Sequence, residues 1–332
     1  MALSPVRLLT SAAPAGLPFS RTVLRALLGR LFGPPPFDPS ADPGDPGLFG
    51  PGSASWKVIS EPSSIIGGIR ALVLQSLHPL AVAGVVEHSS FREDPLGRLH
   101  NTSAYVTAVT FGSTSEALAV TRAVRGAHRR VAGTAPDGRA YRADSPELLG
   151  FVSLALTSSF LACDRAYSPD PIDARTADVF VAEQARAAAL LDPRVDLRAL
   201  SRDPGALAAL RRGTLPLPML TDGSLPTTVA EMETVRERYR GALAAGEQSR
   251  DLLRFLFWPD LSPPLRGAYL PMLMGALATL DDYELRVLGA PPPVALAAPA
   301  ARAQARALAT ALRLATGPSP AVAAATRRAQ AA

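Results

Sequence analysis

The sequence predicts an all-α fold with one multi-helix domain over about residues 56–290. Apolar residues recur at helical spacing in nearly every segment of this range, and prolines and glycines stand where such segments end. No alternation of strand and helix patterns indicates a parallel sheet. The 332 residues are 48% hydrophobic, with a mean hydropathy of +0.15, so a sizeable core is available.

The two ends of the chain differ from this domain in composition. Residues 1–55 are an N-terminal arm followed by a Pro/Gly-rich stretch at 33–55, which resists helix and indicates an extended segment. Residues 291–332 begin with a Pro-rich linker and continue as an Ala/Arg-rich tail. Propensity predicts a helix over 300–316, but few large apolar residues are available to dock it, so we expect a loosely held tail.

Prolines divide the first half of the domain. Pro79 must end or kink an apolar helix over residues 63–77, and it can stand in the first turn of a helix that runs to about Glu87. The next helix begins at Asp94 and Pro95, as cap and first helical residue, and Gly112 ends it.

A capping box and a turn mark the segments that follow. Ser113 with Glu116 predicts a helix start, and that helix ends near Gly133. Pro136, Asp137 and Gly138 predict a turn within a small hairpin. The later helices are expected over residues 145–164, 171–191, 203–212, 227–245, 247–257 and 264–288.

Charge, cysteine content and motifs exclude several function classes. The net charge of +5 is thin and scattered, which argues against a nucleic-acid surface. Cys163 is the single cysteine, which favours a reducing cytosol and a cytoplasmic location. The sequence has no phosphate-binding glycine loop, no G-x-S-x-G elbow and no H-E-x-x-H, so nucleotide-dependent and zinc-hydrolase chemistry are disfavoured.

The N-terminus lacks the compact apolar stretch of a secretory signal, and none is expected. The longest uncharged runs, residues 71–86 and 148–163, are shorter than the roughly 20 apolar residues that a membrane span needs. We therefore expect no transmembrane span, while peripheral membrane contact stays open. The sequence leaves the oligomeric state open as well.

His128 is the first candidate functional residue. All four histidines lie between His78 and His128, and His128 stands on a helical stripe of mostly small apolar residues. We call these residues the apolar stripe: Ala117, Val120, Thr121, Val124, Ala127, His128 and Val131. The histidine is either a core residue with satisfied nitrogens or a neutral metal ligand. A lone histidine favours haem over zinc, because one axial ligand suffices for haem iron.

The preceding helix carries a complementary row of polar residues. Its members lie at spacings of three, four and seven on one face, and we call Arg98, Asn101, Thr102 and Tyr105 the polar row. With one charge and two short hydrogen-bonding groups, this row is either a solvated face or the lining of a pocket for dioxygen or a propionate.

The remaining histidines and three carboxylates have simpler interpretations. His78 and His88 lie near helix ends and are predicted to be structural, and His100 is expected to be exposed. The pattern places Glu87, Asp164 and Glu183 in the interior, and a structural ion pair is the default explanation for Glu183.

Several short motifs occur in a fixed order along the chain: LHP, HSSF, DPLGRL, FG, VRxxH, PDGRxY and PELL. They lie in two segments, LQSLHPLAVAGVVEHSSFREDPLGRLHNTSAYVTAVTFG and VRGAHRRVAGTAPDGRAYRADSPELLGFV. The segment SSFLACDRAY follows them. Over about residues 57–290 the chain resembles the MpaB-like oxygenase family, which includes the latex-clearing proteins (rubber oxygenases). The resemblance implies a globin-like, all-α arrangement around a b-type haem.

The resemblance also implies roles for single residues. His128 corresponds to the proximal iron ligand of the latex-clearing branch, and Arg98, Asn101 and Thr102 correspond to its distal Arg-x-x-Lys-Thr pattern. Asn101 thus replaces a lysine, and Ser153 stands where many bacterial relatives have a histidine.

Together these observations predict a haem b-dependent oxygenase that uses O2 on a small or medium apolar substrate, possible substrates including unsaturated ones. The predicted catalytic residues are Arg98, Asn101 and Thr102, and the predicted cofactor-binding residues are His128, Arg125 and Tyr105. Arg125 either pairs with a propionate or lies at the surface. The alternatives are a haem sensor or carrier without turnover, and a helical protein without haem that binds an apolar ligand.

Overall fold

The computed structural model describes residues 34–89, 95–290, 293–317 and 319–331, with the backbone alone for residues 95–100, 264 and 293–296. This part of the chain has sixteen helices and two short strands, so the predicted all-α class is confirmed. The helices are α2 (Ala54–Ile59), α3 (Ser63–Ser76), α4 (Pro79–His88), α5 (Pro95–Phe111), α6 (Thr114–His128), α7 (Pro146–Tyr167), α8 (Ala174–Ala189), α9 (Leu197–Leu200), α10 (Pro204–Arg212), α11 (Pro218–Thr221), α12 (Val229–Arg240), α13 (Glu247–Phe257), α14 (Pro263–Leu277), α15 (Asp282–Leu288), α16 (Pro293–Thr316) and α17 (Pro320–Gln330).

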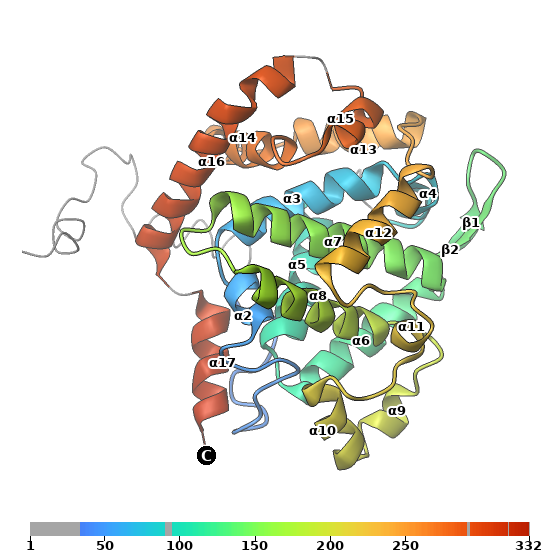
Figure 1. The fold of residues 1–332 in the computed structure, drawn as a ribbon, viewed down its shortest axis with the longest axis vertical. Coiled ribbons are helices and arrows are strands. Elements are labelled where there is room, and N and C mark those ends of the chain that lie inside the picture. Colours follow the sequence, from blue (N-terminus) through green and yellow to red (C-terminus); the bar gives the residue numbers. More distant parts are fainter. Residues whose placement is uncertain (1–33, 90–94, 291–292, 318, 332) are drawn as a thin grey trace, which may run out of the picture.

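Helices α3 and α7 form the most extensive helix–helix contact and cross the middle of the fold (Figure 1). Gly67 on α3 permits the close approach, because a Cβ at this position would lie 2.8 Å from Cδ1 of Phe160 on α7. Helix α14 packs against α3 and α16, and α8 packs against α7. The central pair is therefore covered on both sides by further helices.

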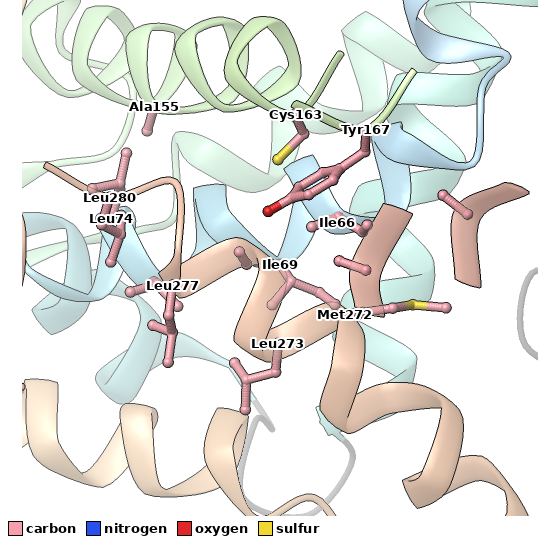
Figure 2. Packing of buried hydrophobic residues seen from close by; sticks show 14 of the residues in the cluster. Ile66, Ile69, Leu74, Ala155, Cys163, Tyr167, Met272, Leu273, Leu277 and Leu280 are labelled. Atoms are coloured by element: carbon pink, nitrogen blue, oxygen red, sulfur yellow. The ribbon is translucent and has the colours of Figure 1, made fainter. Parts of the chain in front are cut away.

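The largest hydrophobic cluster lies among α3, α7, α14 and α16, and Figure 2 shows part of it. Tyr167 extends from α7 into this cluster, and its hydroxyl donates a hydrogen bond to the carbonyl of Gly275 at 2.7 Å. Cys163 lies fully buried beside it, and burial raises the pKa of its thiol to about 12. This thiol is protonated near neutral pH and is a core residue.

Several predicted helix starts agree with the structure. Ser113 and Glu116 form a capping box at the start of α6, and the Ser145 hydroxyl accepts from the backbone N–H of Leu148 at the start of α7. Helix α6 ends at His128, five residues before the predicted Gly133. The predicted hairpin follows, with β1 (Ala132–Thr134) antiparallel to β2 (Ala140–Arg142). The expected cap Asp94 lies outside the described residues.

The segment predicted as one helix over residues 264–288 forms two. Helix α14 ends at Leu277, and Asp281 starts α15 with a second capping box that includes Glu284. The acidic run of Asp281 and Asp282 inside an apolar pattern marks this break. The short helices α2, α9 and α11 were not predicted individually, because one to two turns carry little periodicity.

The C-terminal tail does not lie loose, which differs from expectation. Helix α16 packs against α14 and α7 through the buried residues Ala301, Ala305, Ala309 and Leu312. Small side chains let the helix backbones approach closely, so large apolar residues are not needed for docking. A Cβ at Gly275 would come within 2.5 Å of the Ala305 Cβ. Helix α17 packs against α5.

Helix α7 is long and apolar enough to cross a membrane by length and composition, and it is the one described helix that meets this test alone. Most of its apolar window is buried among other helices. Helices α3 and α4 pass the test together but are bent by 100° relative to each other. A buried core helix of a soluble protein has the same properties, so these helices are weak evidence for membrane insertion.

Candidate functional site

The candidate site lies between α5 and α6, two helices joined through Gly112 and Ser113 and packed against each other. Helix α5 carries the polar row. Asn101 is exposed, and Thr102 and Tyr105 are half-buried. Arg98 and His100 lie on the described backbone of α5, but their side chains lie outside the described residues.

The apolar stripe of α6 is well covered at its beginning and less covered toward its end. Ala117 and Thr121 are fully buried, whereas Val124 and His128 are half-buried. Ala127 beside His128 is exposed. The imidazole of His128 still has its Nδ1 atom shielded from solvent. The end of α6 thus presents an imidazole and small apolar side chains on a face that the rest of the chain covers only in part.

Tyr105 and Thr121 connect the polar row to the apolar stripe. The two side chains share a hydrogen bond. The Thr121 hydroxyl also donates to the Ala117 carbonyl at 2.7 Å. Burial raises the pKa of Tyr105 well above its usual range. Tyr105 therefore points toward α6, and this contact holds the two helices in register one to two turns before His128.

Arg125, one turn before His128, contacts the segment after α8. Its guanidinium donates to the carbonyl oxygens of Val195 at 2.7 Å and Pro193 at 2.9 Å. These bonds tie α6 to the segment after α8. Two of its nitrogens are engaged there, so any contact with a propionate would use the remaining N–H groups.

A second polar cluster stands where α4 and the hairpin meet, close to the end of α6. The buried Tyr141 hydroxyl donates to Glu87 Oε2 at 2.5 Å and lies 3.1 Å from His88 Nε2. Burial, and then the Glu87 carboxylate, raise the pKa of Tyr141 above its usual range. Gly133 leaves room for it, since a Cβ there would lie 2.7 Å from the tyrosine oxygen. Hairpin pairing brings Tyr141 next to the strand that follows His128, and no sequence spacing indicated this cluster.

The other singled-out residues lie apart from the α5–α6 site. His78 is fully buried, caps α4 through Nδ1 and packs on Phe151, with ring centroids 4.3 Å apart. Burial, and then the positive charge of Arg139, lower the pKa of His78 to about 4. Ser153 is half-buried on α7. His78 is thus a neutral structural residue.

The three carboxylates predicted to be interior have different surroundings. Glu87 lies at the surface, with one oxygen against Tyr141. Asp164 is buried and accepts from the backbone N–H of Ile172 at 2.9 Å. Glu183 accepts from the backbone N–H of Ser55 at 2.7 Å, with Arg186 as a nearby positive charge.

The donor chemistry fits a haem better than a bare metal ion. In the described residues no three or more His, Cys, Asp or Glu side chains are placed to hold an ion together. Zinc needs three or four such ligands, whereas haem iron needs one axial ligand. A single imidazole on a half-covered apolar face has the composition of a haem-contacting surface.

Comparison with known proteins places this site in a family context. Residues 56–314 match the family described as ER-bound oxygenase mpaB/B′/rubber oxygenase, catalytic domain. The matched region contains α5, α6, the hairpin and most of α16. Searches of curated proteins and of solved structures found no significant match.

Proposed function

Because the chain belongs to the family of the mpaB/B′ and rubber oxygenase catalytic domains, and is therefore an oxygenase, we propose that it acts through haem b on a small or medium apolar organic substrate. The observation that supports the proposal most directly is the position of His128. It stands at the end of the apolar stripe, on a face of α6 that other residues cover only in part.

In this proposal His128 would hold the haem iron. Haem supplies the oxygen chemistry when it is bound, and the protein orients the substrate and limits access. Val124 and Val131 offer apolar contact for the macrocycle. Tyr105 acts through Thr121 as a positioning residue, because their hydrogen bond sets how α5 lies against the apolar stripe.

The polar row would line the space for the substrate. Asn101 and Thr102 would supply hydrogen-bond donors there, and Arg98 would add a positive charge. Asn101 supplies these bonds without the charge of a lysine. Tyr141, near the same end of α6, stays protonated because burial and Glu87 raise its pKa, and its hydroxyl holds the side chains of Glu87 and His88 in place.

The spectrum of the purified protein tests the haem assignment. We expect a Soret band that His128→Ala removes, while the exposed His88→Ala retains it. Circular dichroism establishes that both variants are folded. A colourless protein that does not take up added haem would overturn the proposal and leave the third alternative, a helical protein that binds an apolar ligand.

Measurement of oxygen consumption separates the oxygenase from a haem sensor or carrier. Asn101, at the position that corresponds to a lysine of the latex-clearing branch, favours this alternative. We expect uptake of O2 with at least one compound from a panel of unsaturated lipids, terpenoids and phenols, and its loss in His128→Ala. A haem-loaded protein without uptake on the whole panel would support the sensor or carrier.

We also propose a cytoplasmic location, which the single buried cysteine supports.

A further inference from the structure

A cleft of about 310 Å³ opens between α7, α12 and the turn that joins α14 to α15, away from α5 and α6. Its volume is at the lower end of the range for small-molecule sites. Helix α7 contributes Ser158, Leu161 and Arg165, which lie on one helical face at spacings of three and seven. Helix α12 contributes Met232 and Arg236, one turn apart. The wall thus combines guanidinium groups with apolar side chains.

Most charged groups of the cleft are already paired with one another. Arg236 donates to Glu233 at 2.9 Å and to Asp281 at 3.0 Å. Arg70, at the base, forms a buried ion pair with Glu284 at 3.0 Å and donates to the Ser159 hydroxyl. These pairs neutralise the carboxylates of the cleft.

Two groups of the cleft lack such partners. Ser158 is 8% exposed, and its hydroxyl has no hydrogen bond to any described residue. Arg165 is exposed on the same face of α7 and has neither a hydrogen bond nor an ion pair within the described part of the chain. A buried hydroxyl is normally hydrogen-bonded, so a bound molecule or water is expected to satisfy it. Both groups can donate, and Arg165, which also attracts the neighbouring Asp164 carboxylate, brings a positive charge.

The neighbouring space extends the same arrangement. A cavity of about 20 Å³, room for about one water, shares Ser158 and Arg236 with the cleft. Arg240 also lines it, and its buried Nε has no hydrogen-bond partner among the described residues. The cavity that shares Ser158 with the cleft therefore also has an unsatisfied donor, Arg240 Nε.

We propose that this cleft is a binding site for an organic monocarboxylate, separate from the oxygenase site. The carboxylate accepts from Arg165 and from the Ser158 hydroxyl, and the body of the acid occupies the rest of the cleft, whose lining includes Leu161 and Met232. Charge-assisted bonds to a guanidinium are the strongest that these residues can offer, which favours a carboxylate over a neutral alcohol. The volume of the cleft, which exceeds what a small inorganic anion needs, favours an organic acid.

Calorimetric titration of the full chain with octanoate tests the site. We expect saturable binding that Arg165→Gln and Ser158→Ala each weaken, with Arg165→Gln weakening it about tenfold or more, as expected for the loss of one charge-assisted hydrogen bond. Arg202→Gln, an exposed arginine outside the cleft, should bind like the unaltered protein. Absence of octanoate binding, or binding by both cleft variants as tight as that of the unaltered protein, would overturn the proposal.

Two further ligands and one further variant make the result specific. Octanol should bind at least about tenfold more weakly than octanoate, and inorganic phosphate should not displace octanoate. Octanol that binds equally well, or phosphate that competes, would overturn the assignment to an organic acid. The same titrations in His128→Ala should give the unaltered affinity, so failure of the haem assignment and failure of this site are distinguishable.

Discussion

Arg70 and Glu284 lie 214 residues apart in the chain and form an ion pair of 3.0 Å in the interior, with side chains only 3% and 4% exposed. The pair joins α3 to α15. Glu284 also accepts from the backbone N–H of Asp281 at 3.0 Å, as part of the capping box that starts α15. One carboxylate therefore begins a helix and neutralises a buried guanidinium.

Glu284→Gln should lower the free energy of unfolding by about 3–5 kcal/mol, because it leaves the Arg70 charge buried without its counter-charge. Urea denaturation measures the change. Asp137→Asn is the control, since it breaks the exposed Asp137–Arg139 pair and should cost at most about 1 kcal/mol. Equal costs for the two variants would mean that burial does not set the value of the Arg70–Glu284 pair.

Gly67→Ala and Gly68→Ala are neighbouring substitutions on α3 with opposite expected signs. A Cβ at Gly67 would meet Phe160 Cδ1 at 2.8 Å and its Cα at 3.1 Å, which forces α3 and α7 apart. We expect a loss of about 1–3 kcal/mol. A Cβ at Gly68 meets nothing within 4 Å, so alanine should add about 0.5–1 kcal/mol through helix propensity. Thermal unfolding of both variants is the measurement, and a stabilised Gly67→Ala would contradict the packing argument.

The elements predicted from sequence are those with a local chemical signal. Ser113 with Glu116 and Ser145 before Pro146 each cap a helix, because an N-cap is decided within four residues. The docking of α16 was not predictable in this way. It depends on Ala305 meeting Gly275, which is distant in the chain, and a local pattern does not contain that contact.

In the candidate site, too, the sequence predicts the features with a local pattern and misses those that depend on distant contacts. Periodicity placed His128 on a stripe, and the row on α5 that contains Tyr105 does contact that stripe, through Thr121. The Tyr141 cluster and the cleft around Ser158 were not predicted, because they join residues from three or more elements that only the fold brings together. The direction of Arg125 also depends on a distant carbonyl, that of Val195.

Val124→Trp tests the half-covered face beside His128. The larger side chain should occupy the apolar face one turn before the imidazole, so we expect the folded variant to lose most of its Soret absorbance. Ala123→Trp places the same side chain on an exposed position of the same helix and should keep the haem. Absorbance per protein, with circular dichroism to establish folding, is the measurement. Undiminished haem in Val124→Trp would mean that the cofactor does not lie on the apolar stripe.

His78 should make the protein less stable in acid. Its folded pKa is about 4, below the usual value of about 6.5 in an unfolded chain, so the unfolded state binds the proton first as pH falls. The contribution of neutral His78 to the free energy of unfolding is therefore fully present above about pH 6.5. It is lost as the pH falls from about 6.5 to about 4, and the total loss is about 3 kcal/mol. His78→Asn keeps an N-cap acceptor without titrating, so its urea midpoint should depend less on pH in this window. Parallel pH profiles of the two proteins would refute this role.

Arg328 docks the C-terminal helix, and its removal should release that helix. The buried guanidinium donates to the carbonyl oxygens of Phe111 at 2.8 Å and Asp45 at 3.0 Å, so it joins α17 to the end of α5 and to the N-terminal segment. Arg328→Ala leaves both carbonyls without this donor, and we expect a loss of about 2–3 kcal/mol and faster cleavage near the C-terminus by proteinase K. Arg327→Ala removes an exposed neighbour of the same type and should change neither the free energy of unfolding nor the rate of cleavage.

A third variant tests the geometry of the guanidinium. Because lysine cannot present two donors in a fixed fork, the stability and cleavage rate of Arg328→Lys should lie between those of Arg328→Ala and Arg327→Ala. Cleavage of Arg328→Ala at the rate of Arg327→Ala would show that apolar contacts of α17 hold the helix without the guanidinium.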